Sequence, residues 1–203
     1  MTRHRPSSQR LRLFESDILE KLTVISPRSF ATIWSFVLAM VLYAGWNTAS
    51  LPLALGLVSA GLLVWSLFEY AMHRFLFHLE IRSDFCRRMI FVMHGNHHAS
   101  PNDPYRNMMP PIISVVWSGA IWIGFLLLLG TKGSLLFLGF AAGYVIYDSV
   151  HYACHQLPMR GPLLGRLHKH HIRHHYANQD GNYAITTIFW DRLFGTEVPA
   201  KNR

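Results

Sequence analysis

The chain has 203 residues, of which 51% are hydrophobic and only 15% are charged. Because soluble domains of this length carry about a quarter of their residues as charged side chains, this composition argues against an ordinary soluble protein. The 19 Lys and Arg residues outnumber the 11 Asp and Glu residues. These basic residues flank apolar segments instead of alternating with aromatic side chains, which argues against a nucleic-acid partner and favours anionic lipid headgroups.

The length allows a single domain that covers residues 1–203. Within residues 1–28 we expect a basic start followed by an interfacial amphipathic helix. Arg3, Arg5 and Arg10 precede a stretch from Leu11 to Leu22 in which apolar residues alternate with acidic ones. This pattern is typical of a helix that lies in the membrane interface. It does not fit a cleavable signal, because no short apolar core with a small-residue cleavage site directly follows the charges.

Four apolar segments follow in two pairs. No charged residue occurs between Arg28 and Glu69, a gap of 40 positions, which is too long for one bilayer crossing and about right for two. A second uncharged stretch opens at Pro110 and Pro111. We therefore predict an all-α integral membrane protein with four transmembrane helices in two hairpins, at about residues 30–46, 51–68, 110–130 and 133–150. Residues 69–106 and 151–198 are predicted to form a His-rich helical cap.

The distribution of Lys and Arg predicts the orientation of these helices. Of the 19 such residues, 18 lie before the first span, between the second and third spans, or after the fourth, and only Lys132 lies in one of the other two loops. The positive-inside rule then places both termini and the His-rich cap in the cytosol. We expect a bacterial cytoplasmic membrane rather than the endoplasmic reticulum.

Twelve of the 13 histidines form four clusters, and all four lie on the predicted cytosolic side. One such cluster is weak evidence, because His-rich tracts can be metal-sticky tails. Four clusters on one membrane face favour a metal centre, because so many imidazoles without a cation would be largely unpaired and would repel one another when protonated. The clusters are His73 and His78; His94, His97 and His98; His151 and His155; and His168, His170, His171, His174 and His175.

The spacing within the clusters predicts how the imidazoles converge. Residues at positions i, i+3 and i+4 share one helix face, so we expect residues 94–98, residues 171–175 and the pair His151 and His155 each to aim at one point. His73 and His78 are five residues apart and would converge only on a distorted helix. The residues between them give no sign of a distortion, so this pair could instead serve two different metals.

Ten histidines fit two metal ions, since one ion takes about four to six ligands. Imidazole binds Fe, Zn, Cu and Ni, so the ligand type alone does not identify the metal. A zinc hydrolase seldom needs so many histidines, whereas a pair of iron ions can bind and split dioxygen. We therefore expect two iron ions with O2 as co-substrate, although a purified sample could hold zinc.

Two carboxylates are candidates to orient the ligands. Glu69 lies one helical turn before His73, and Asp148 lies three residues before His151. Each carboxylate is expected to accept the free N–H of a ligating imidazole and so to fix its tautomer. For Glu69 an interfacial charge at the end of a span is an equally good interpretation.

These motifs resemble the fatty acid hydroxylase branch of the sterol desaturase superfamily, whose members are membrane enzymes with a histidine-bound dimetal centre. The resemblance covers about residues 60–198, and residues 94–103 are most similar to fatty acid 2-hydroxylases. The matching stretches are residues 68–78 (FEYAMHRFLFH), 94–103 (HGNHHASPND), 147–155 (YDSVHYACH), 170–175 (HHIRHH) and 189–196 (FWDRLFGT).

The resemblance implies ten metal ligands. His168 and His170 lie outside the ligand spacing, but His170 could replace His171 if the local helix is shifted by one residue. The implied ligands are His73, His78, His94, His97, His98, His151, His155, His171, His174 and His175.

The resemblance also implies an O2-dependent hydroxylase that acts on a lipid acyl chain drawn from the bilayer, at C2 of a free or amide-linked fatty acid. Nothing before residue 30 is long enough to be a fused cytochrome b5 domain, so we expect a separate electron donor of the cytochrome b5 or ferredoxin type. Two alternatives stay open at this point. One is a desaturase or a sterol or carotenoid oxidase with the same metal centre, and the other is a non-catalytic membrane metal-binding protein. A zinc hydrolase fits less well, since the chain has no HExxH motif.

Overall fold

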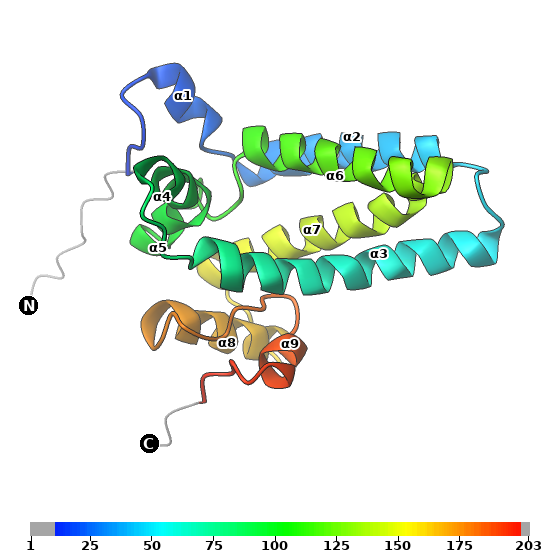
Figure 1. Cartoon of the computed structure of the whole chain (residues 1–203). Helices are drawn as coiled ribbons and strands as arrows, with labels where there is room; N and C mark the ends of the chain where they lie inside the picture. Colours follow the sequence, from blue (N-terminus) through cyan, green and yellow to red (C-terminus); the bar gives the residue numbers. More distant parts are fainter. Residues whose placement is uncertain (1–10, 200–203) are drawn as a thin grey trace, which may run out of the picture.

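In the computed structural model of the chain, residues 11–199 are described, and all of their regular elements are helices (Figure 1). The predicted all-α fold is confirmed for this part of the chain. Four long helices lie side by side, and the shorter helices gather mainly near one end of them. The long helices are α2 (Pro27–Gly45), α3 (Leu51–Met72), α6 (Pro111–Leu129) and α7 (Gly133–Gln156). The shorter helices are α1 (Asp17–Leu22), α4 (Asp84–Ile90), α5 (Asn96–Ala99), α8 (Leu164–Tyr176) and α9 (Phe189–Leu193).

The ends of the long helices follow from local sequence signals. Ser26 caps α2 by accepting a hydrogen bond from the amide of Ser29, and prolines occupy the first turns of α2, α3 and α6, where a missing N–H breaks no helical hydrogen bond. Gly130 ends α6 with a positive φ of 60°, a conformation that glycine adopts without strain. Proline and glycine therefore delimit the apolar helices.

Within residues 11–199, three continuous helical stretches are long and apolar enough to cross a membrane, namely Pro27–Gly45, Leu51–Phe77 and Pro111–Gln156. The first two agree with the first two predicted spans. The third contains α6 and α7, which are joined by the 3-10 turn η3 (Gly130–Lys132) and fold back on each other. The third and fourth predicted spans therefore correspond to the two arms of one helical hairpin, and the count of four bilayer crossings stays a prediction.

Helix α7 is the centre of the bundle, with α2, α3 and α6 packed around it. Its backbone meets that of α3 directly. A Cβ atom placed on Gly139 would lie 1.9 Å from the carbonyl oxygen of Val58, and one on Gly61 would lie 2.1 Å from that of Leu136. Small residues at such crossings let two apolar helices approach closely. The two glycines thus fix α3, which leads to His73, against α7, which carries His151 and His155.

Helix α1 is attached to the bundle by a buried ion pair. The fully buried side chain of Arg106, in the segment before α6, pairs with Glu20 and also contacts Thr23. Ile18, Leu19 and Leu22 of α1 are exposed, and the role of α1 as an interfacial helix stays a prediction. The helix is shorter than the predicted stretch, and Arg3, Arg5 and Arg10 lie outside the described residues.

Candidate metal centre

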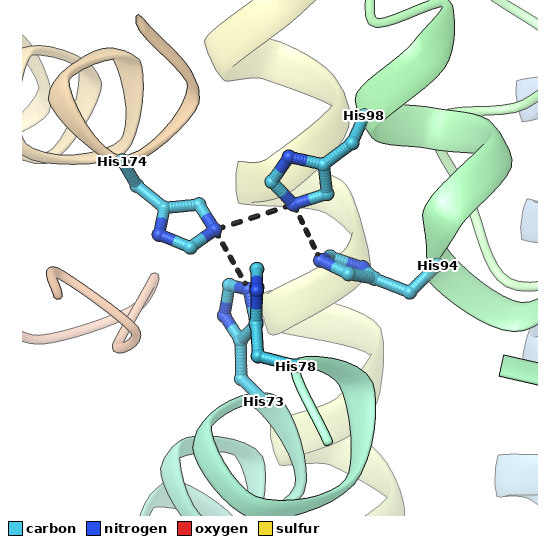
Figure 2. A group of neighbouring side chains, drawn as sticks. All are labelled: His73, His78, His94, His98 and His174. Atoms are coloured by element: carbon cyan, nitrogen blue, oxygen red, sulfur yellow. Dashed lines mark hydrogen bonds between the residues drawn. The ribbon is translucent and has the colours of Figure 1, made fainter. Parts of the chain in front are cut away.

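The structure brings ten histidines together in two groups of five. Within each group the five ligand nitrogens lie within 4.8 Å of one another. The first group consists of His73, His78, His94, His98 and His174, and the second of His97, His151, His155, His171 and His175. Figure 2 shows the first group, in which side chains from three separate parts of the chain point toward one another. These ten residues are the ones that the sequence analysis named.

The two histidines that are five residues apart converge because the helix changes its pitch there. Residues His73–Phe77 form a π-helical turn, η1, directly after α3. Hydrogen bonds in a π-helix run from residue i to residue i+5, so positions five apart come to lie nearly above one another. His73 and His78 therefore both belong to the first group. The interpretation that they serve two different metals is wrong.

A second π-helical turn, η2 (Phe91–Gly95), carries His94. The side-chain amide of Asn96 donates hydrogen bonds to the carbonyl oxygens of Phe91 and Val92, at 2.9 Å and 2.7 Å. A side chain thereby satisfies carbonyl groups that the change of pitch takes out of the regular α-helical pattern. Both departures from α-helical geometry thus lie directly at candidate ligands.

The expectation that residues 94–98 and residues 171–175 each aim at one point is wrong. His94 and His98 belong to the first group, but His97 belongs to the second. In an α-helix positions i and i+4 lie about 40° apart, whereas consecutive residues lie about 100° apart. Helix α5 lies between the two groups, so its neighbouring histidines diverge.

Helix α8 repeats this division with the groups exchanged. His171 and His175, at positions i and i+4, belong to the second group, while His174 belongs to the first. The pair His151 and His155 on α7 stays together in the second group, as the spacing predicts. Both HxxHH motifs therefore contribute side chains to both groups.

The nitrogen atoms have the separations expected of ligands of one ion. In the first group Nε2 of His94 lies 2.8 Å from Nε2 of His98, and Nε2 of His73 lies 3.1 Å from Nε2 of His174. In the second group Nε2 of His97 lies 2.9 Å from Nε2 of His151. Two imidazole nitrogens bound about 2.1 Å from an ion and at right angles to each other would lie about 3.0 Å apart.

The tautomers of two ligands show why a cation fits. Nδ1 of His73 donates to the carbonyl oxygen of Tyr183 at 2.5 Å, and Nδ1 of His174 donates to that of Gly181 at 2.7 Å. In a neutral imidazole only one nitrogen carries a proton, so both Nε2 atoms present lone pairs to each other. No hydrogen atom can bridge the 3.1 Å between them, whereas a metal ion accepts both lone pairs.

Burial keeps the imidazoles in the form that binds metal. Burial, together with the neighbouring imidazoles, lowers the pKa of His94, His97 and His171 well below the ordinary value. The same causes lower the pKa of His98 to about 3, and burial is the main reason that the pKa of His174 falls to about 4. These rings are therefore neutral near pH 7, with lone pairs available for a metal ion.

Glu69 and Asp148 do not accept hydrogen bonds from the ligand histidines that the sequence predicted as their partners. Glu69 accepts hydrogen bonds from Trp65, Ile185 and Thr186. Its expected partner, His73, donates instead to the backbone of Tyr183. A backbone carbonyl thus replaces the predicted carboxylate.

Asp148 also has other hydrogen-bond partners than the histidine expected for it. It accepts hydrogen bonds from the amide of Met109 at 3.0 Å and from the hydroxyl of Tyr144 at 2.7 Å. His151, its expected partner, instead hydrogen-bonds to the backbone of Asn107. The sequence could not reveal carbonyl partners, because every residue has a carbonyl group and only the fold selects which one is near.

His168 and His170 lie in neither group. Nε2 of His170 is 3.0 Å from Oδ2 of Asp191, which is itself completely buried. The structure thus places His171 in the second group and His170 against a carboxylate. Asp191 was not singled out from the sequence, and its place within the FWDRLFGT stretch was the only signal that could have found it.

A small cleft adjoins both groups at the junction of the cap with the long helices. Its wall combines three histidines with three methionines, with residues of the segment before α6 and with residues of α7. The lining residues are Met93, His94, His97, Arg106, Asn107, Met108, Met109, Tyr147, Asp148 and His151.

Comparisons with known proteins agree with this geometry. The sequence model of the family described as fatty acid hydroxylase matches residues 58–196. A fatty acid 2-hydroxylase of Macaca fascicularis is 36% identical, over 98% of this chain and 59% of the relative. The dihydroceramide fatty acyl 2-hydroxylase FAH2 of Arabidopsis thaliana is 37% identical, over 91% of this chain and 79% of the relative. The chain spans about three fifths of the length of the mammalian relatives that it matches.

A solved structure of full-length scs7p, in which only the hydroxylase domain is visible, superposes with a TM-score of 0.85. It is 32% identical to this chain, and the match covers 92% of this chain and 72% of the other. The ceramide very long chain fatty acid hydroxylase scs7 of Schizosaccharomyces pombe is 43% identical over 70% of this chain and 42% of the relative. Sequence and fold therefore lead to the same relatives.

Proposed function

Because this chain belongs to the fatty acid hydroxylase family, we propose that it is a membrane-bound monooxygenase that hydroxylates lipid acyl chains, with C2 of a fatty acyl group as the favoured position. One observation carries the proposal most strongly. Ten neutral histidine side chains form two adjacent groups, each of five residues, beside apolar helices. The names of the relatives, which include fatty acid 2-hydroxylases and a dihydroceramide fatty acyl 2-hydroxylase, support the position.

The ten histidines would hold two metal ions, which we expect to be iron. When bound, such a pair supplies the activation of O2 that an unreactive C–H bond requires. The overall reaction consumes one O2, two electrons and two protons, inserts one oxygen atom into the C–H bond and releases one water. The protein binds the ions through neutral imidazoles and holds the ring orientations through carbonyl oxygens such as those of Gly181 and Tyr183.

The cleft beside the two groups is the proposed place for the reacting part of the acyl chain. It contacts His94 of the first group together with His97 and His151 of the second. Met93, Met108 and Met109 give one part of its wall an apolar and adaptable surface. Met109 lies two residues before α6 and Tyr147 lies within α7, so the acyl chain is proposed to approach the cleft from the side of these apolar helices.

The electron donor is proposed to be a separate protein of the cytochrome b5 or ferredoxin type with an acidic surface. Helix α8 supports this proposal. Its inner face carries His171, His174 and His175, whereas Arg166 and Lys169 are exposed on its outer side. No acidic residue occurs from residue 157 to residue 179. A negatively charged carrier would therefore be attracted to the helix that contacts both groups.

We propose that the protein is bound to a membrane with its His-rich cap in the cytosol, as the positive-inside rule predicts. The relatives named above come from a monkey, a plant and a fungus, and all three organisms are eukaryotes. The expectation of a bacterial membrane therefore has no support from these relatives and stays a prediction.

Expression in a host that lacks the activity tests the function. Lipids from cells with the wild-type protein and with a His98→Ala, His155→Ala double variant are compared by mass spectrometry. We expect 2-hydroxylated acyl chains only with the wild type. A loss of two hydrogen atoms without a gain of oxygen would indicate a desaturase, and an altered sterol or carotenoid would indicate another oxidase. Tightly bound metal without any reductant-dependent oxygen uptake would identify a metal-binding protein and overturn the proposal.

A further inference from the structure

Two buried carboxylates that are not metal ligands lie on either side of a short backbone segment, residues 181–186. Glu69 is at the end of α3 and Asp191 is in α9, and their side chains are 3% and 0% exposed. Neither carboxylate has a basic side chain of Lys or Arg among its hydrogen-bond partners in the described structure. A buried carboxylate requires hydrogen-bond donors. Here the backbone amides of the segment supply several of them, so the two side chains hold the segment tightly.

Asp191 holds the first half of this segment. Its Oδ1 accepts a hydrogen bond from the amide of Tyr183 at 2.9 Å, and its Oδ2 accepts one from the amide of Ala184 at 2.9 Å. Thr196 and His170 donate to the remaining positions, at 2.7 Å and 3.0 Å. The carboxylate thus binds two consecutive backbone amides and is itself fixed by two side chains.

Glu69 holds the second half. Its Oε1 accepts hydrogen bonds from the amides of Ile185 and Thr186, at 3.3 Å and 3.1 Å, and from the hydroxyl of Thr186 at 2.7 Å. Its Oε2 accepts a hydrogen bond from the indole of Trp65 at 3.1 Å. Four consecutive amides, from residue 183 to residue 186, are therefore bound by two carboxylates.

The carbonyl groups of the same segment face the first histidine group. Gly181 accepts from Nδ1 of His174, and Tyr183 accepts from Nδ1 of His73. Asn182, between them, has a positive φ of 57° and donates through its side chain to the carbonyl oxygen of His170 at 2.9 Å. This conformation directs both neighbouring carbonyls toward imidazoles of one group only.

The second group is oriented from elsewhere. His151 hydrogen-bonds to the backbone of Asn107, in the segment before α6. None of the hydrogen bonds described for residues 181–186 reaches an imidazole of the second group. Both groups share α5 and α8, but the backbone carbonyls that orient these imidazoles come from different segments for the two groups.

We propose that Glu69 and Asp191 are positioning residues that hold residues 181–186 so that two backbone carbonyls orient His73 and His174, and that they control the affinity of the first metal site alone. The inference rests on the metal binding in the proposed function. Loss of a group that orients a metal ligand weakens metal affinity about 10–100-fold. We expect this weakening at one site and no weakening at the other.

The test isolates each site in the purified full chain. A His155→Ala, His175→Ala background leaves the first site intact, and a His78→Ala, His98→Ala background leaves the second. Asp191→Asn is added to each background, and the affinity for Fe2+ and Zn2+ is measured by competition with a chelator. The substitution should weaken binding about 10–100-fold in the first background and less than about twofold in the second. Glu69→Gln should have the same selectivity.

Glu197→Gln is the matched control. Glu197 lies in the same C-terminal segment and pairs with Arg192 at 2.8 Å, and its side chain makes no described contact with residues 181–186. It should leave both affinities unchanged. If Asp191→Asn prevents folding, Asn182→Gly decides the matter, because glycine accepts the positive φ while the side-chain hydrogen bonds to His170 and Val198 are lost. It too should weaken the first site alone.

Equal weakening of both sites by Asp191→Asn or Asn182→Gly would overturn the inference, because a merely structural role would affect both. An unchanged affinity of the first site would also overturn it.

The proposed function fails separately. A wild-type protein that hydroxylates no lipid but shows the selective loss of metal contradicts the function and leaves the inference intact, whereas a hydroxylase whose metals do not respond to Asp191→Asn contradicts only the inference.

Discussion

The imidazoles of His73 and His174 are held with their lone pairs facing each other, because both outer nitrogens donate to backbone carbonyls. This arrangement is unfavourable without a cation and favourable with one. It therefore ties the stability of the cap to the occupation of the centre, since a ligand that binds only the folded state raises the free energy of unfolding.

Removal of metal should consequently lower the thermal stability of the cap. At a free metal concentration about 1,000 times the Kd, one bound ion adds about 4 kcal/mol to the free energy of unfolding, which corresponds to roughly 10 °C for a chain of this size. Scanning calorimetry in detergent, before and after dialysis against a chelator, measures the difference. Reloading with metal is the control, and a melting temperature that does not depend on metal would contradict the expectation.

The metal-free protein should also be sensitive to acid. The pKa of His98 is lowered to about 3 and that of His174 to about 4, whereas in the unfolded chain both titrate near 6.5. As the pH falls from about 6.5 towards 3, the unfolded state binds protons that the folded state refuses, so the free energy of unfolding decreases. The stability contributed by the neutral rings is fully present above about pH 6.5.

We therefore expect the melting temperature of the metal-free protein to fall by roughly 5 °C or more between pH 7 and pH 5. Circular dichroism at both pH values provides the measurement. A His98→Ala variant should show a smaller decrease, because one of the titrating rings is absent. A melting temperature that stays constant over this range would mean that these imidazoles have the same pKa in the folded protein as in the unfolded chain.

Adjacent histidines should have separable effects. His97→Ala removes a member of the second group, and His98→Ala removes a member of the first. Each variant should retain about one tightly bound metal per chain and lose hydroxylation, as measured by elemental analysis and lipid profiling. His168→Ala is the matched control, because His168 belongs to neither group, and it should retain both metals and the activity. Two variants that release the same metal would contradict the division of the HxxHH motifs.

Among the helices, the contact between α3 and α7 leaves the least room for change. A Cβ atom on Gly139 would lie 1.9 Å from the carbonyl oxygen of Val58, while a Cβ atom on Gly119 of α6 would meet nothing within 4 Å. Gly139→Ala should therefore separate the helices and reduce the free energy of unfolding by about 1–3 kcal/mol, with loss of activity. Gly119→Ala should be neutral. Thermal unfolding together with lipid profiling compares the two, and equal behaviour would show that the helices repack without difficulty.

The helices are predictable from the sequence because apolar composition and the positions of Pro and Gly are local signals. Pro27, Pro52 and Pro111 lie at the starts of long helices, and Gly130 lies at the end of one. The two π-helical turns are not predictable in this way, because the residues whose side chains bind their carbonyl groups, such as Asn96 for η2, are not distinctive in type or spacing.

The membership of the candidate site was predictable, but its internal division was not. Histidine is a distinctive ligand, so all ten residues could be named from their spacing and the family resemblance. Helical geometry separates His97 from His98, but the histidines of α8 that each of them meets depend on where α5 and α8 lie relative to each other, which no local pattern encodes. The roles of Gly181 and Tyr183 depend on the backbone alone and leave no trace in the residue type.

The molecule as a whole has a predicted orientation in the membrane that follows from Lys and Arg alone. Thr131 lies in the turn between α6 and α7, and Lys169 is exposed on α8. In a background in which Cys86 and Cys154 are replaced by serine, Thr131→Cys should react with an impermeant maleimide from outside intact cells. Lys169→Cys should react only after lysis. The reverse pattern would contradict a cytosolic cap.

The division of the HxxHH motifs has a consequence for the spacing of the two ions. His97 and His98 are neighbours on α5, joined by a single peptide unit, and they point to different groups. The distance between the two proposed ions would therefore depend largely on covalent geometry, which hardly changes as the helices move. Fluctuations in bilayer thickness that tilt α3 or α7 will strain both sites together but will stretch the gap between them very little. The separation of the two groups is thus set largely by one pair of adjacent residues on α5.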